Sequence, residues 1–168
     1  MIKDILTNMN MYFDGINFVS EVDELSPPKI TPKFREYKAG GMGAAVDIPT
    51  GEIEKLESSF TLNSVSKEVL RQLKVVPGST VPIEFRGGTV SQDGSKGRVV
   101  VTQRGLIKEI DYGSWKAGDD TSLKIAMTLY YYRLAINDEV IHEIDPVNFV
   151  CIINGVDQTQ ELRAALGI

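Results

Sequence analysis

The sequence has little of the chemistry that small proteins use for cross-linking or metal binding. Its 168 residues contain a single cysteine, Cys151, and a single histidine, His142. One cysteine excludes an internal disulfide, and one cysteine with one histidine excludes a Cys/His zinc site. Stability beyond that of a hydrophobic core must therefore come from partners.

Long apolar runs and an excess of basic charge are also missing. No unbroken apolar stretch approaches the ~20 residues that a membrane-spanning helix needs, and the first eight residues do not resemble a signal peptide. We therefore expect a protein that stays on the cytoplasmic side of synthesis, without membrane anchoring. The net charge of -5 argues against a general affinity for nucleic acid backbones, which requires an excess of lysine and arginine.

The composition that remains is that of an ordinary globular protein, with 42% hydrophobic and 24% charged residues. At about 150 residues per domain, the length predicts one domain over residues 1–168. Residues 60–116 are rich in lysine and arginine, whereas the segments before and after them are acidic. These charges are either ordinary solvated surface or complementary patches that orient copies of the chain against one another.

Alternating patterns predict that the chain is mostly strand. Asp14-Gly15, between two short apolar runs, is a typical hairpin signal because both turn positions favour positive φ. Period-two alternation predicts strands over 52–62 and 123–131, each with one face in the core. In the second of these, the odd positions as far as Tyr131 are expected to face the core. Further strands are expected at 81–86, 98–110 and 140–144.

Two short stretches favour helix. Residues 66–73 place apolar side chains on one stripe behind a Ser66 cap, and residues 158–166 do the same with Asp157 as the expected N-cap and Gly167 as the end. The stretch 38–51 is rich in glycine and has no period. We expect it to be a structureless arm that is functional or bound by a partner.

A search for catalytic chemistry finds none. His142 lies in an apolar run without a nucleophile motif, and Cys151 is expected to be a small buried residue rather than a reactive thiolate. Gly40-Gly41-Met42-Gly43 is not followed by the Lys-Ser/Thr pair of a phosphate-binding loop. The sequence therefore predicts a protein that is not an enzyme and has no cofactor or metal.

Several blocks of the sequence carry a family resemblance. They are Leu6 to Gly15, Pro28 to Met42, Arg104 to Asp111, Trp115 to Gly118, Tyr131 to Leu134, Glu143 to Asn148 and Ile153 to Asp157. Together they resemble the major tail tube proteins of contractile-tailed bacteriophages, a family shared with the inner tubes of R-type pyocin-like bacteriocins. The blocks occur in that family's order and span most of the chain.

The resemblance implies a mainly β, antiparallel sandwich or barrel-like fold with a flanking α-helix, to which the residue pattern adds a short C-terminal helix. It implies hexameric rings that stack into a hollow tube inside a contractile sheath, in a virion or bacteriocin particle assembled in the host cytoplasm. The implied partners are further copies of the chain and the sheath, tape-measure, baseplate and tail-terminator proteins, with DNA only in transit.

Site residues follow from combining this picture with the residue pattern. The extended arm at 38–51 is expected to contact the neighbouring ring through Gly40, Gly41, Met42, Gly43, Ala44, Ala45 and Val46. The candidates for the lumen lie on the polar faces of the predicted strands and are Lys55, Glu57, Glu84 and Arg86.

Two other classes stay open at this point. A tube protein of a related contractile secretion system would share the architecture. A small β-sandwich binding module would share the strand count, but it should expose an aromatic platform and remain monomeric. The only tryptophan, Trp115, lies in a turn-like context beside Lys116 and Gly118.

Overall fold

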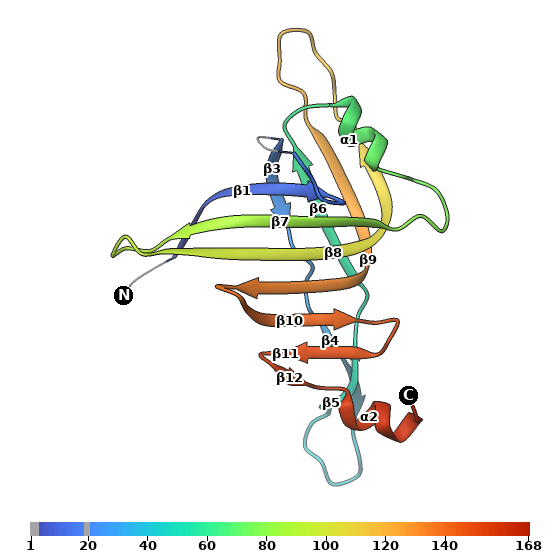
Figure 1. The fold of residues 1–168 in the computed structure, drawn as a ribbon. Coiled ribbons are helices and arrows are strands. Elements are labelled where there is room, and N and C mark those ends of the chain that lie inside the picture. Colours follow the sequence, from blue (N-terminus) through green and yellow to red (C-terminus); the bar gives the residue numbers. More distant parts are fainter. Residues whose placement is uncertain (1–3, 19–20) are drawn as a thin grey trace.

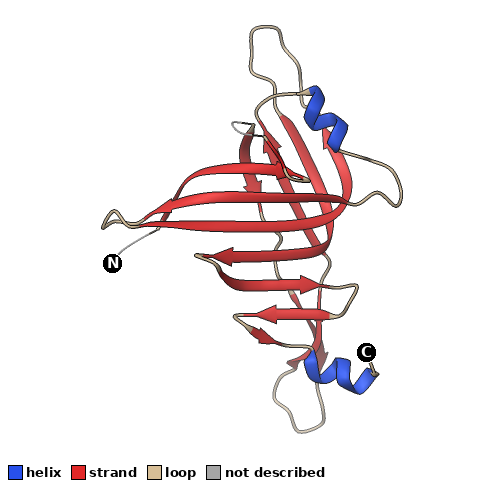
Figure 2. Ribbon diagram, viewed as in Figure 1, coloured by secondary structure: helices blue, strands red, loops and turns tan. Residues whose placement is uncertain are grey.

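The computed structural model describes residues 4–18 and 21–168, and within these ranges most of the chain is antiparallel β structure (Figure 2). The strands are β1 (Ile5–Phe13), β2 (Ile16–Asn17), β3 (Val22–Ser26), β4 (Pro32–Tyr37), β5 (Val46–Ile53), β6 (Leu56–Leu62), β7 (Val81–Val90), β8 (Lys96–Asp111), β9 (Leu123–Ile136), β10 (Glu139–Asp145), β11 (Val150–Ile153) and β12 (Val156–Asp157). The helices are α1 (Lys67–Gln72) and α2 (Gln160–Leu166). The predicted mainly β fold with a flanking and a C-terminal helix is confirmed.

One large sheet dominates the molecule. Within the described ranges it has ten strands, in the order β12-β11-β10-β9-β8-β7-β1-β2, with β6 beside β9 and β3 beside β6. The first half of β9 pairs with β6 and its second half pairs with β10, on the same edge. The sheet therefore folds over at β9, so that β3 and β6 cross behind β1 and β7 (Figure 1).

A bulge in β9 changes which side chains reach the core. Arg104 pairs with Tyr131, but the next residue, Gly105, pairs with Leu129, so that Tyr130 has no partner on β8. One extra residue moves every following side chain to the other face. The prediction that Tyr131 faces the core is therefore wrong, and the buried tyrosine is Tyr132.

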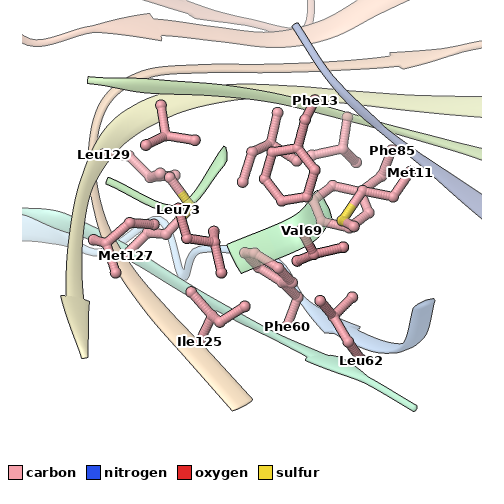
Figure 3. Packing of buried hydrophobic residues seen from close by; sticks show 14 of the residues in the cluster. Met11, Phe13, Phe60, Leu62, Val69, Leu73, Phe85, Ile125, Met127 and Leu129 are labelled. Carbon is pink, nitrogen blue, oxygen red and sulfur yellow. The ribbon is translucent and has the colours of Figure 1, made fainter. Parts of the chain in front are cut away.

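The core lies where the sheet folds over, and α1 closes one side of it (Figure 3). Phe60 packs edge-on against Phe85 at a centroid distance of 5.5 Å, which joins β6 to β7. Val69 of α1 is fully buried. Ser66 begins this helix as predicted, because its hydroxyl accepts a hydrogen bond from the Val69 amide at 3.1 Å.

The C-terminal helix begins later than the sequence predicts. Its N-cap is Thr159, not Asp157. The Asp157 carboxylate instead accepts the Thr159 amide at 3.1 Å and pairs with the Arg163 guanidinium. That ion pair fixes α2 to β12, whereas a cap would have engaged only the backbone. Gly167, at φ 77°, ends the helix as expected.

The stretch predicted as a structureless arm is mostly a hairpin. Residues from Val46 onward form β5, which pairs with β4, and the loop between the two strands is confined to 38–45. The strand predicted over 52–62 is two strands, because β5 ends at Ile53 and β6 begins at Leu56. Both differences arise because β5 pairs with β4 outside the large sheet. Both faces of this hairpin are exposed to solvent, so its sequence does not alternate between core and surface residues.

Candidate assembly surfaces

A row of side chains crosses the face of the sheet that is turned away from the core. Residues directly opposite one another on neighbouring strands share a face. The strand register joins Tyr12 of β1 to Glu84 of β7, Thr102 of β8, Arg133 of β9 and Glu143 of β10. We call this surface the polar face. It runs across five strands and carries both signs of charge.

Arginines on the polar face are held by neighbours on the same face. The Arg86 guanidinium pairs with the Glu84 carboxylate and lies 4.5 Å from the centroid of the Tyr12 ring. The hydrogen bond with Glu84 raises the pKa of Arg86. Both predicted lumen candidates on β7 therefore lie on this surface as one neutral pair.

A second group on the polar face lies one row away. The Arg104 guanidinium is 5.8 Å from the centroid of the Tyr131 ring, and the Tyr131 hydroxyl donates to the Glu143 carboxylate at 3.0 Å. Burial and this hydrogen bond raise the pKa of Tyr131. The bulge at Tyr130 is what turns Tyr131 toward this face, so the group could not be found from the alternation of the sequence.

The other two lumen candidates form a separate cluster. Glu57 of β6 accepts a hydrogen bond from Lys108 of β8 at 2.7 Å and lies 3.2 Å from Lys55. The two lysines, Lys108 first, lower the pKa of Glu57. Lys55 lies between β5 and β6 rather than on a strand. Sequence reasoning missed Lys108, which is 51 positions from Glu57 and meets it only through the pairing of β6 and β8 with β9.

The β4–β5 hairpin forms a separate two-stranded sheet. Every residue of β4 is exposed, as is all of β5 except its last residue. Its strands pass behind β10, β11 and β12, and its tip projects beyond them at the end of the molecule that carries α2 (Figure 1). Six of the predicted inter-ring residues, Gly40 to Ala45, lie in its tip, and Val46 is the first residue of β5.

One face of the hairpin is apolar with a single cation. Tyr37 pairs with Val46, and Arg35 pairs with Ile48. We call these four residues the Tyr37 face. Tyr37, Val46 and Ile48 are 49%, 49% and 46% exposed. On the opposite face Glu36 is paired directly with Asp47, and like charges in this position destabilise a hairpin. A lone two-stranded hairpin is marginally stable at best in water.

A groove of about 390 Å³ lies between β3 and the strands β1, β7, β8 and β9. We call it the β3 groove. Its floor contains buried Phe85 and Tyr132, and Leu6 at its border is 54% exposed. Its rim carries the exposed carboxylates of Asp23 and Glu24. No sequence pattern indicates this groove, because the residues that line it come from separate strands.

An exposed aromatic pair lies in the loop between β8 and β9. The Trp115 indole donates to the Tyr112 carbonyl at 2.9 Å, and the two rings meet edge to face at 82°. Trp115 is 64% exposed. Perpendicular rings do not form the flat stacking platform that a carbohydrate-binding module would need.

The lone histidine and cysteine lie near each other on β10 and β11, both half-buried beside the base of the hairpin. Burial, with a smaller contribution from Asp157, raises the pKa of the Cys151 thiol, which disfavours the reactive thiolate. Among the described residues, no three His, Cys, Asp or Glu side chains are placed to hold a metal ion. The helices in the same ranges are too short or too polar to span a membrane.

Comparison with known proteins identifies the family. The model of the family "Phage tail tube protein FII" matches residues 3–167. The tail tube protein of Escherichia phage P2 is 31% identical over 163 residues, which cover 95% of each chain. The major tail tube protein of Serratia phage KSP20 is 32% identical over 160 residues, covering 94% of this chain and 92% of the relative.

A solved structure has the same fold at low sequence identity. A chain of the sheath-tube complex of PVC, an extracellular contractile injection system, in its extended state superposes with a TM-score of 0.52, 12% identity and coverage of 76% of this chain and 86% of that one. The relatives are structural proteins rather than enzymes. The chain belongs to the phage tail tube protein family, and its role is that of a structural subunit of a tail tube.

Proposed function

We propose that this subunit forms hexameric rings that stack head to tail into a hollow tube, and that the β4–β5 hairpin is the contact between rings. The observation that carries the proposal is the hairpin itself, which pairs outside the large sheet and exposes both faces. A protruding element that meets a different surface on the next copy makes a heterologous contact, and such contacts grow filaments. Gly40 to Val46 lie where this contact would form.

Within a ring, we propose that the free edges of the large sheet pair with neighbouring copies. Its edge strands are β2, β12 and, on the branch through β6, β3; β2 and β12 have only two residues each. Most of β1 and part of β11 therefore have no neighbour on their outer side among the described strands. Unpaired edges invite further strands, and a closed ring removes them.

We further propose that the polar face lines the bore. In this proposal Glu84 and Arg86 of the polar face contact its water, and so does the separate cluster of Lys55 and Glu57. A conduit for a polyanion should not carry free cations, because contacts between arginine and phosphate would retard passage. The pairing of Arg86 with Glu84, and of Lys55 and Lys108 with Glu57, supports such a conduit.

The proposed surroundings of the tube are a contractile sheath outside it, with a baseplate, a tape-measure protein and a tail terminator at its ends or within it. The particle would be a virion or a headless bacteriocin, assembled in the cytoplasm of the host. The likeness to a chain from a sheath-tube complex supports the sheath as a partner. A tube of a related contractile secretion system is the alternative that the same likeness leaves open.

The proposed ring contact is tested by shortening the hairpin tip. Replacing Gly40 to Ala45 with a two-residue Asn-Gly turn keeps the β4–β5 pairing but removes the reach of the tip. We expect the variant to fold and to form single rings, measured by size-exclusion chromatography and negative-stain microscopy, while the wild-type chain forms tubes. Replacing the Ser91–Ser95 turn of β7 and β8 in the same way is the matched control for a shortened loop. Long tubes from the tip variant would overturn the assignment.

A further inference from the structure

We infer that the Tyr37 face of the hairpin docks into the β3 groove of a second copy of the chain. The inference rests on the proposed function and adds the surface that receives the hairpin. It starts from two complementary features of the described residues: no described residue covers the apolar Tyr37 face, and none fills the apolar β3 groove. Large exposed apolar patches on soluble proteins commonly mark interfaces.

The groove has an apolar lining that suits such a face. Its volume of about 390 Å³ is bounded by apolar side chains on four strands of the sheet, with Leu25 and Pro27 on the β3 side. Met9, Val99 and Leu134 in its wall are only partly buried within one subunit. The three apolar side chains of the Tyr37 face, at nearly half exposure each, match this lining.

A single subunit cannot fill its own groove with its own hairpin. The hairpin projects at the end of the molecule that carries α2, whereas β3 lies at the end that carries α1 (Figure 1). The element and its receiving surface are thus at opposite ends, which is the arrangement that a head-to-tail contact between copies needs. The occupant is therefore a second copy rather than the same chain.

Charge sets the orientation of this contact. Asp23 and Glu24 lie exposed on the rim of the groove. Arg35 lies on the Tyr37 face, and Lys38 follows β4 at the edge of the tip. Among the ion pairs of the described residues, none involves any of these four side chains. Two acids facing two bases across an otherwise apolar contact favour one register of the hairpin in the groove.

The first test is a charge exchange. Asp23→Arg with Glu24→Arg should lower incorporation of subunits into tubes roughly tenfold, as should Arg35→Glu with Lys38→Glu, because each places like charges together. The chain that carries all four substitutions should recover tubes of wild-type length. Asp119→Arg with Asp120→Arg, in the loop between β8 and β9, is the control and should assemble normally. Unimpaired assembly of both double variants, or no recovery in the fourfold variant, overturns the inference.

The second test keeps these charges and locates the contact directly. In a Cys151→Ala background, Ile48→Cys on the hairpin and Leu6→Cys at the groove should be joined between subunits by a short bismaleimide, giving ladders of linked subunits from assembled tubes. Ile48→Cys with Glu161→Cys on α2 is the control and should give none. Tubes that assemble without ladders would place the hairpin elsewhere and leave the proposed function standing. Failure of the wild-type chain to form tubes would reject the proposed function itself.

Discussion

Gly105 lies so close to the backbone of Thr128 that a Cβ atom on residue 105 would be 1.9 Å from the Thr128 carbonyl oxygen. This close approach occurs at the bulge in β9, where Arg104 of β8 pairs with Tyr131 but Gly105 pairs with Leu129. Because the obstructing atom belongs to the backbone, a side chain at 105 could be accommodated only by moving the two strands apart. The bend of the large sheet therefore depends on glycine at this position.

Gly105→Ala should be strongly destabilising. Separating β8 from β9 at the bulge is expected to cost about 3 kcal/mol in free energy of unfolding, which for a chain of this size lowers the melting temperature by roughly 6–12 °C. Gly88→Ala in β7 is the matched control, because a Cβ there would meet nothing within 4 Å. Differential scanning calorimetry of the two variants is the measurement. Equal melting temperatures would contradict the close approach.

Gln103→Met should stabilise the subunit. The Gln103 side chain is fully buried, its amide nitrogen has only the Met127 sulfur at 3.6 Å, and its oxygen has no partner. Replacing a buried polar group with an apolar one of similar shape should raise the free energy of unfolding by about 1 kcal/mol. Chemical denaturation of the unassembled subunit tests this, with exposed Gln92→Met as the control. A fall in stability would mean that the amide is satisfied in solution.

Attachment of α2 should weaken in acid. The hydrogen bond from Arg163 lowers the pKa of Asp157 from 3.8 to about 2. A carboxylate whose pKa is lower in the folded state contributes stability above its unfolded pKa, and this contribution is lost as the pH falls from about 4 to about 2. The protection factors of residues 160–166 against amide hydrogen exchange, which are corrected for the intrinsic pH dependence of exchange, should fall as the pH falls through that range. The Asp157→Asn variant should have lower protection factors than wild type at pH 6 and lack this fall. If the Asp157→Asn variant responded to acid as strongly as wild type, the response would come from another carboxyl group.

Replacing two acidic residues of the proposed bore with lysine should make tubes retain nucleic acid. Glu57→Lys with Glu84→Lys would leave Lys55, Lys108 and Arg86 without their partners, so that phosphates could bind them. Filter retention of DNA by assembled tubes should rise and should weaken steeply with salt. Asp120→Lys with Glu161→Lys, at two exposed positions outside the proposed bore, makes the same change in net charge and is the control. Retention equal to that control would place these side chains outside the bore.

Removing the lone thiol should leave assembly intact. Cys151 is half-buried beside Ile53, and Cys151→Ala is expected to cost about 1 kcal/mol through lost packing. Tubes of normal length should form, and particles that contain them should deliver their contents as wild-type particles do. Normal tubes with abolished delivery would point to a chemical role for the thiol.

Local features of this protein were predictable because neighbouring residues cause them. Asp14-Gly15 forms its hairpin turn with φ of 47° and 82°, and Gly167 ends α2 in the left-handed region. These signals depend on the conformations that a few adjacent residues allow. The alternation at 123–129 likewise predicted one face of β9 correctly, since each side chain there follows the two-residue period.

The assembly surfaces were only partly predictable, since contacts between distant segments create them. The segment 38–51 was predicted to be a structureless arm, but its residues from Val46 onward pair with β4, and the Tyr37 face that results depends on cross-strand register. The β3 groove combines side chains from five strands.

Composition and local pattern by themselves determined that this chain is a mainly β protein with two short helices and a protruding arm. Only the tertiary structure decided that Lys108 contacts Glu57, that Tyr131 turns outward and that β3 lies at the opposite end of the molecule from the hairpin tip. The reason is physical. Turns and caps are set by the torsion angles of adjacent residues, whereas a bulge or a groove depends on where the chain returns after dozens of residues.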